Sequence, residues 1–122
     1  MTRVSETLEI QRRRYLADVE FANSTRVIPA GRLIETPTRY VALELIRQLI
    51  RDRDAGMDVN DWADYSHTVV PISYADAVIL DRQWAARAGQ VRARLQQSGV
   101  LARIADVYTS RTLEEFWRKY DV

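Results

Sequence analysis

Cysteine is absent from this chain of 122 residues. Without thiols the protein forms no disulfide, uses no thiolate nucleophile and binds no zinc through sulfur. Histidine occurs once, as His67, so the sequence holds no histidine cluster for zinc and no serine–histidine–aspartate arrangement. Only four glycines are present, and none forms the glycine-rich loop that cradles nucleotide phosphates. These absences exclude most of the common catalytic and cofactor-binding motifs.

Long apolar runs and an excess of charge are lacking as well. No run approaches the roughly 20 residues that a membrane-spanning helix requires. The first residues, MTRVSETLEIQRRR, lack the apolar core of a secretory signal. The formal net charge is +1, so no global field attracts nucleic acid or an acidic membrane. Together with the absence of cysteine, these features predict a cytoplasmic protein without a membrane partner.

Lysine is almost missing, because Lys119 is the only one and all other basic residues are arginine. Arginine makes planar, bidentate contacts with carboxylate and phosphate groups. One interpretation of this bias is therefore a phosphate-rich partner. The other is a biased base composition of the genome, and that simpler interpretation is favoured.

The periodicity of apolar residues predicts a single domain over residues 1–122, of the α/β class and rich in helices. We expect a first helix over 5–23. A loop over 23–35, which contains proline and glycine, follows it and includes a short extended piece at 26–28. Three adjacent arginines in the first helix point in different directions, so they are interpreted as solvated surface.

The second helix has the clearest signals. It begins at Pro37, where the missing N–H group is harmless, with Thr36 as its cap, and it continues to about Asp54 before Gly56. Its apolar stripe consists of Val41, Ala42, Leu45, Ile46, Leu49 and Ile50. Three charged residues lie off that stripe and are predicted to face solvent or a partner: Glu44, Arg47 and Arg51.

A shorter helix and a strand are predicted next. Asp58 is a suitable cap for a helix over 59–67, which should end before Pro71. Residues 75–80 form a continuous apolar run interrupted only by Asp76. Such a run is typical of a central strand that is buried on both faces.

The last third alternates again between helix and strand. A helix over 82–97 should end at Gly99, and a second strand is expected over 104–108. One face of that helix carries Trp84, Ala88, Val91 and Leu95. The final helix opens with Thr112 and Glu115, the spacing of a capping box. The order of strand, helix and strand predicts a right-handed βαβ crossover and a parallel sheet.

Most of the possible chemistry lies in the segment NDWADYSHTVVPISYADAVILD, residues 60–81. Asp61 and Asp64 share one face of the predicted helix, and Asp81 follows the strand, where open α/β sheets usually carry their sites. If the helix docks above that edge, three carboxylates converge. A magnesium or manganese ion would relieve their repulsion, activate a water and stabilise charge on a phosphodiester.

Each aspartate also has a structural interpretation, which taken alone is the favoured one. Asp58, Asp61 and Asp64 all lie in the first turns of a helix, where the helix dipole favours acidic residues. Asp81 is able to cap the helix that follows it by accepting from unpaired N–H groups.

Two further residues of this segment are candidates for secondary roles. Asp76 near the start of a buried strand would need a partner, because a buried carboxylate without one is costly. His67 lies three residues after Asp64, so it either donates a hydrogen bond to the Asp64 carboxylate on one helix face or is a satisfied structural residue, which is the favoured interpretation. The tryptophans are expected to fill the core rather than stack on bases, and they are Trp62, Trp84 and Trp117.

The stretches TPTRYVALELIRQLIR and NDWADYSHTVVPISYADAVILDRQW resemble the carboxyl-terminal part of bacterial PIN-domain-like proteins. The resemblance covers residues 36–122 and leaves 1–35 as a divergent helix and loop. It implies a small parallel sheet of PIN-like type and acidic residues that hold a divalent metal for RNA cleavage. The matching positions are Asp61 and Asp64 on the helix, Asp81 after the strand and, less closely, Glu44 as the middle acidic residue.

One departure from that family is large. PIN domains begin with an apolar strand that ends in an essential aspartate, whereas this chain begins with the helical sequence MTRVSETLEIQRRRYL. The resemblance therefore implies a shortened member, a member completed by a partner, or one that has lost its activity. An incomplete acidic cluster would bind metal weakly and position it poorly.

Two functions follow from these features. The favoured hypothesis is a shortened, inactive relative of magnesium- or manganese-dependent ribonucleases that acts through protein–protein or RNA contacts. The alternative is an active metal-dependent endoribonuclease, a toxin or defence effector, in which Asp61, Asp64 and Asp81 hold the metal and Arg82 contacts phosphate. An exposed sheet edge, which is usually paired or covered, predicts a homodimer or a protein partner.

Overall fold

The computed structural model describes residues 3–28, 37–52, 56–99 and 104–120, and these form mainly helices. The elements in chain order are α1 (Arg3–Ala17), α2 (Val19–Ser24), α3 (Pro37–Arg51), α4 (Val59–Tyr74), β1 (Ala77–Ile79), α5 (Arg82–Gln97), β2 (Asp106–Tyr108), a 3-10 turn η1 (Ser110–Thr112) and α6 (Leu113–Tyr120). The predicted helix-rich α/β class with a small parallel sheet is confirmed, whereas the PIN-like type of that sheet stays a prediction. No helix in these ranges is long and apolar enough to cross a membrane.

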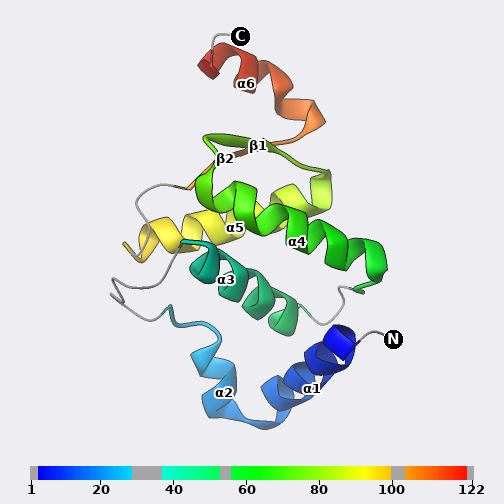
Figure 1. Ribbon diagram of the computed structural model, residues 1–122. Helices are drawn as coiled ribbons and strands as arrows, with labels where there is room; N and C mark the ends of the chain where they lie inside the picture. The colour runs from blue at the N-terminus through cyan, green and yellow to red at the C-terminus, as the bar shows by residue number, and fades with distance from the viewer. Residues whose placement is uncertain (1–2, 29–36, 53–55, 100–103, 121–122) are drawn as a thin grey trace.

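The elements are arranged in layers along the molecule, and the two termini lie at opposite ends (Figure 1). Helix α6 lies on one side of the sheet, and α4 and α5 lie on the other. Helix α3 packs beneath α4 and α5 and also contacts α1 on its far side. Because three helices contact α3, much of its circumference is removed from water.

The sheet in the described part of the chain consists of β1 and β2 alone, which pair in parallel. The predicted βαβ order is therefore confirmed, since α5 connects the two strands. Val78 pairs in register with Val107, and both side chains pack in the core beneath the sheet. On the other face Tyr108 meets Phe116 of α6, with ring centroids 5.6 Å apart.

Two groups of apolar side chains hold the fold together. The main core joins α3, α4, the sheet and α5, and its members that are 0–1% exposed include Val41, Leu45, Ile72, Trp84, Val91 and Leu95. A smaller cluster, in which Leu8 of α1 packs on Leu49 and Ile50 of α3, attaches the first helix. Complete burial of one such side chain contributes about 1.5–3 kcal/mol.

The predicted first helix is wrong as one continuous element. The chain leaves the helical conformation at Asp18, whose side chain accepts a hydrogen bond from the N–H of Phe21 at 3.1 Å. Asp18 thereby begins α2, because an aspartate at this position satisfies an unpaired donor of the next helix. The predicted extended piece at 26–28 forms no strand.

The predicted end of the fourth helix before Pro71 is also wrong. Helix α4 continues through Pro71 to Tyr74, and the N–H of Ala75 donates to the Pro71 carbonyl. The last turns of α4 bury Val69 and Ile72 in the main core, and this packing outweighs the missing donor of the proline.

The predicted strand over 75–80 is shorter and less covered than expected. Only Ala77–Ile79 are in β1, and Ile79 is 50% exposed, so the strand is not buried on both faces.

The cap before α6 also differs from the prediction. Thr109 begins η1 and exchanges bonds with Thr112, so Glu115 is not the partner in that box.

Helix α5 has the predicted bounds and the predicted buried face, and Gly99 follows it with a φ of 73°. Helix α3 begins at Pro37 as expected. The expected Thr36 cap, most of the expected loop and the expected helix end near Asp54 lie outside the described residues. Among the tryptophans, Trp84 is buried and Trp62 half-buried, but Trp117 is 46% exposed, which contradicts the expected core position.

Candidate functional site

The aspartates at the two ends of the acidic segment act as helix caps. Asp81 accepts a hydrogen bond from the N–H of Trp84 at 2.9 Å and begins α5. Asp58 begins α4 as predicted, and its backbone N–H donates to Asp61 Oδ2 at 3.1 Å in a capping box. The structural interpretation of Asp61 and Asp81 is therefore the one that the hydrogen bonds support.

The remaining residues of that segment do not complete a metal site. The part of the chain that the structure describes contains no group of three or more histidine and carboxylate side chains that could hold one ion. The metal centre of Asp61, Asp64, Asp81 and Glu44 stays a prediction that gains no support from this geometry. Asp76 was expected to be buried but is exposed, and His67 is exposed as well.

Glu44 differs most from its expected position. It was expected to face solvent or a partner, yet it is 1% exposed. It follows Val41 by three residues and precedes Gln48 by four, so it lies on the side of α3 that packs against α5. The apolar stripe alone underestimated the buried surface, because α3 is covered from several sides.

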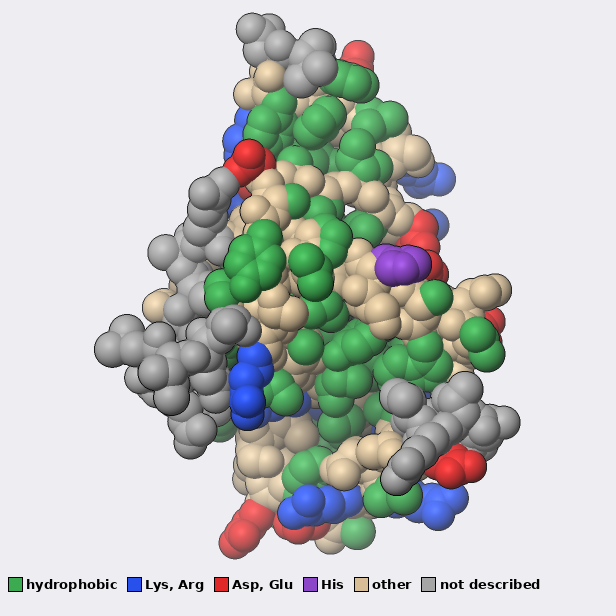
Figure 2. All heavy atoms as spheres, in the orientation of Figure 1, with side chains coloured by type: hydrophobic (Ala, Val, Ile, Leu, Met, Phe, Trp, Pro, Cys, Tyr) green, Lys and Arg blue, Asp and Glu red, His purple; other side chains and the backbone are tan. Residues whose placement is uncertain are grey.

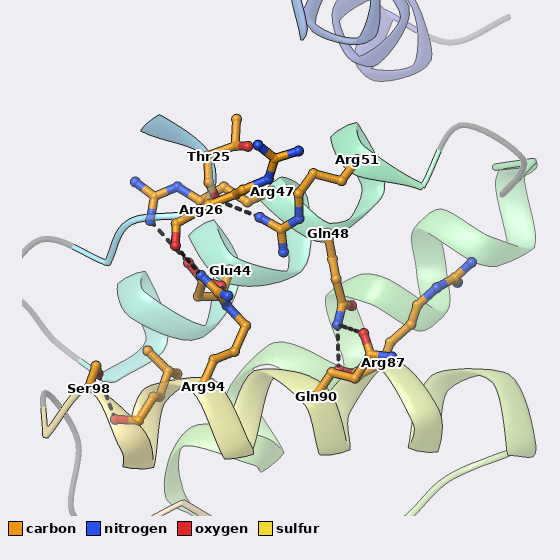
Figure 3. Close-up of polar contacts among 11 residues, drawn as sticks. Thr25, Arg26, Glu44, Arg47, Gln48, Arg51, Arg87, Gln90, Arg94 and Ser98 are labelled. Atoms are coloured by element: carbon orange, nitrogen blue, oxygen red, sulfur yellow. Dashed lines mark hydrogen bonds and ion pairs between the residues drawn. The ribbon is translucent and has the colours of Figure 1, made fainter. Parts of the chain in front are cut away.

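Two arginines bind this buried carboxylate, one from its own helix and one from α5. Arg47 Nη1 lies 3.1 Å from Glu44 Oε1, and Arg94 Nε lies 2.9 Å from Glu44 Oε2 (Figure 3). Both carboxylate oxygens are thus paired, as a buried charge requires. The pairing also fixes the direction of two guanidinium groups at the point where α3 crosses α5.

Arg94 and one further arginine, Arg51, hold the residues that follow α2. Arg94 Nη2 donates to the Arg26 carbonyl at 2.6 Å, and Arg51 Nη1 donates to the Thr25 carbonyl. Burial lowers the pKa of Arg51 below its usual value, and the positive charges of Arg94 and Arg26 lower it further, while Glu44 opposes them. The lowered pKa of Arg51 therefore comes first from its burial and then from the neighbouring positive charges.

We name this group the arginine cluster, and it consists of Arg26, Arg47, Arg51 and Arg94 around Glu44. Glu44 pairs with Arg47 and Arg94, whereas Arg26 and Arg51 bind the Tyr15 hydroxyl and the Thr25 carbonyl. Counted over the described residues alone, this cluster has four positive charges and one negative charge, on a chain whose net charge is only +1. Excess charge of this kind, on rigid guanidinium groups, favours the binding of an oxyanion.

A cleft of about 250 Å³ opens beside the cluster. It is lined by Arg26, Ile28, Arg94, Gln97 and Ser98, so it lies where the loop after α2 meets the end of α5. Four of these five lining residues have side chains that form hydrogen bonds, and two of the four are arginines. The cleft can therefore take a ligand that carries an anionic group.

Sequence reasoning missed this site for two reasons. Glu44 and Arg94 are fifty residues apart, and only the packing of α3 on α5 brings them together. In the sequence, Glu44 directly precedes the buried Leu45 and Arg94 directly precedes the buried Leu95. A charged residue next to an apolar stripe is the sequence signal that could have indicated this site. The predicted phosphate contact Arg82 lies in the first turn of α5, about 18 Å along the helix from Arg94.

Comparison of the chain with protein-family models, with curated proteins and with solved structures found no match.

Proposed function

We propose that this chain is a non-catalytic binding protein that takes phosphate-bearing ligands at the arginine cluster. The observation that carries the proposal is the excess of three positive charges that the described residues place around the buried Glu44. Arginine forks match the geometry of phosphate oxygens, and the pairing with Glu44 holds two of these forks in place before a ligand arrives. RNA and small phosphorylated molecules both carry the required group.

The proposal keeps the PIN-like relationship as a hypothesis about ancestry. A helix-rich chain with a small parallel sheet is compatible with a shortened, inactive member of that family. The capping bonds of Asp61 and Asp81 give these carboxylates a structural role, so binding without cleavage is the simpler function. Neither a magnesium nor a manganese ion is required for it.

Ligand-dependent stabilisation tests the proposal. At constant ionic strength, replacement of chloride by inorganic phosphate should raise the thermal midpoint of the wild-type protein. A ligand at ten times its Kd stabilises by about 1.4 kcal/mol. Arg26→Gln should lose most of this gain, because its exposed guanidinium belongs to the cluster, whereas Arg82→Gln removes the same charge elsewhere and should keep it. Equal gains in all three proteins would refute the proposal.

The alternative of an active endoribonuclease has a separate test. Manganese-dependent cleavage of RNA should be absent from the purified wild-type protein if the proposal is correct. Cleavage that disappears in Asp81→Asn would instead establish the metal-dependent enzyme, since asparagine caps a helix as well as aspartate does but is a poorer metal ligand.

Self-association is a second candidate function, and one face of α4 favours it. This α4 face consists of Val59, Ala63, Ser66, Val70 and Tyr74, all exposed and all without charge. Val59, Val70 and Tyr74 are 71%, 54% and 59% exposed. Figure 2 shows hydrophobic side chains on this side of the molecule, with acidic side chains directly beside the single histidine.

We propose a second copy of this chain as the occupant of the α4 face. Charged residues make up 29% of the chain, so most other surfaces would bring charged side chains into an interface. Two copies of the uncharged α4 face would pair without the cost of desolvating charged side chains. Sedimentation should show a concentration-dependent dimer that Val70→Glu weakens at least tenfold. Val19→Glu on α2, which is also exposed, is the control and should leave association unchanged. A monomer at all concentrations would exclude this candidate.

A further inference from the structure

The cleft beside the arginine cluster combines two guanidinium groups with a neutral wall. We propose that it seats the terminal phosphate of a small phosphate monoester, with the organic part of the ligand against Ile28 and Gln97. This inference rests on the proposed function and names the class of ligand. It concerns the five residues that line the cleft, which are Arg26, Ile28, Arg94, Gln97 and Ser98.

Arg94 provides the fixed part of the anion site. Its Nε and Nη2 atoms are occupied by Glu44 Oε2 and by the Arg26 carbonyl, at 2.9 and 2.6 Å. Its Nη1 group has no partner in the described part of the chain and is left for a ligand. Because two bonds hold the guanidinium plane, little side-chain entropy is lost when an anion binds.

Arg26 provides a second, more adaptable cation. Its Nη2 donates to the Tyr15 hydroxyl at 2.7 Å, and its guanidinium lies 5.7 Å from the centre of the Tyr15 ring. These contacts hold the long side chain beside the cleft while leaving it exposed. A phosphate between Arg26 and Arg94 would receive charge-assisted hydrogen bonds from both.

The rest of the cleft suits a neutral organic group. Ile28 offers an apolar surface, and the exposed Gln97 amide is able both to donate and to accept a hydrogen bond. The hydroxyl of Ser98 donates to the Leu95 carbonyl at 2.8 Å, which fixes the Ser98 side chain beside the cleft. An inorganic anion would make no contact with Ile28 or Gln97.

Size and charge favour a small ligand over a nucleic-acid strand. The cleft, at about 250 Å³, is slightly smaller than typical drug-sized pockets, which begin near about 300 Å³. A strand gains affinity by contacts to many phosphates along a row of basic groups. Here the excess charge is gathered at one place, and the net charge of +1 supplies no wider attraction.

Calorimetric titrations at fixed ionic strength test the inference with three probes: glycerol phosphate as a monoester, dimethyl phosphate as a diester, and a single-stranded RNA without terminal phosphates. We expect the monoester to bind the wild-type protein at least tenfold more tightly than the diester, because the dianion pairs with both arginines. Arg26→Gln should weaken the monoester about tenfold. Gln97→Leu should weaken it severalfold while leaving inorganic phosphate unchanged, and Arg82→Gln should have no effect.

The outcomes separate the two proposals. If no probe binds and inorganic phosphate does not bind either, both the proposed function and this inference are overturned. If the RNA binds in an Arg26-dependent manner while glycerol phosphate does not, the proposed function stands and the monoester inference fails. If Gln97→Leu binds glycerol phosphate as the wild type does, the neutral wall has no role and the inference also fails.

Discussion

Asp81 shows how one residue type can serve two different roles at the same position. It follows β1, where a metal ligand was expected, and it accepts the hydrogen bond that begins α5. Sequence alone left both roles open, because an aspartate between a strand and a helix satisfies either pattern. The hydrogen bond from the N–H of Trp84 establishes the cap, and the metal role of Asp81 stays a prediction.

Two substitutions at Asp81 separate these roles. Asp81→Ala should lower the free energy of unfolding by about 1 kcal/mol, because the N–H of Trp84 loses its acceptor. Asp81→Asn should leave stability within a few tenths of that of the wild type, because asparagine is an equally good cap. Urea denaturation without added metal measures both values. A large loss in Asp81→Asn would show that the negative charge matters and would speak against a purely structural cap.

Asp106 controls the acid sensitivity of the contact between the sheet and α6. Its carboxylate accepts hydrogen bonds from Lys119 and from the Tyr120 hydroxyl and pairs with Arg92 at 2.8 Å. The hydrogen bond from Lys119 is the main reason why the pKa of Asp106 lies below its usual value, and Tyr120 and Arg92 add to this effect.

This lowered pKa predicts a specific pH dependence. A carboxyl group whose pKa is lower in the folded state stabilises the fold above its unfolded pKa and loses that contribution as the pH falls through the folded value. Asp106→Asn should therefore be less stable than the wild type at pH 5.5, and the difference should shrink as the pH falls below about 4. Denaturant midpoints from pH 6 to pH 2.5 provide the measurement. A difference that stays constant over this range would show that Asp106 acts through shape and not through charge.

At the scale of elements, prediction succeeded where the local signals and the packing agreed. Helix α5 has a cap, a single apolar face and a glycine after its end, and its bounds were predicted to the residue. The parallel pairing of β1 and β2 followed from the strand–helix–strand order. The break at Asp18 and the passage of α4 through Pro71 were missed, because each depends on which helix faces the rest of the chain covers.

Pro71 offers a test of that last explanation. Its ring removes a donor that would bind the His67 carbonyl, so α4 carries a local defect that packing has to offset. Pro71→Ala should restore the hydrogen bond and raise the free energy of unfolding by about 1–3 kcal/mol. Guanidinium denaturation checks this value, with Pro37→Ala at the first position of α3, where the missing N–H breaks no helical hydrogen bond, as the proline control. A destabilised Pro71→Ala would mean that the proline favours the native fold in a way that its helical position does not explain.

At the scale of the whole molecule, the main core and the arginine cluster lie in different places. The core joins α3, α4, the sheet and α5, whereas the arginine cluster lies where α3 and α5 meet the end of α2. The predicted stripes of α3 and α5 supplied their share of the core, but no predicted stripe contained Val69 and Ile72 of α4. The arginine cluster could not be predicted from the sequence, because its charges come from three segments and only the tertiary fold brings them around Glu44.

The most direct test of the arginine cluster follows its own N–H groups. Phosphate should be titrated into the isotope-labelled wild-type protein at constant ionic strength while the arginine Nε–H signals are recorded by NMR. We predict saturable shifts for Arg26 and Arg94, which line the cleft, and no shift for Arg82 at the other end of α5. Unchanged signals for Arg26 and Arg94, or shifts of the same size for Arg82, would contradict a specific anion site at the cluster.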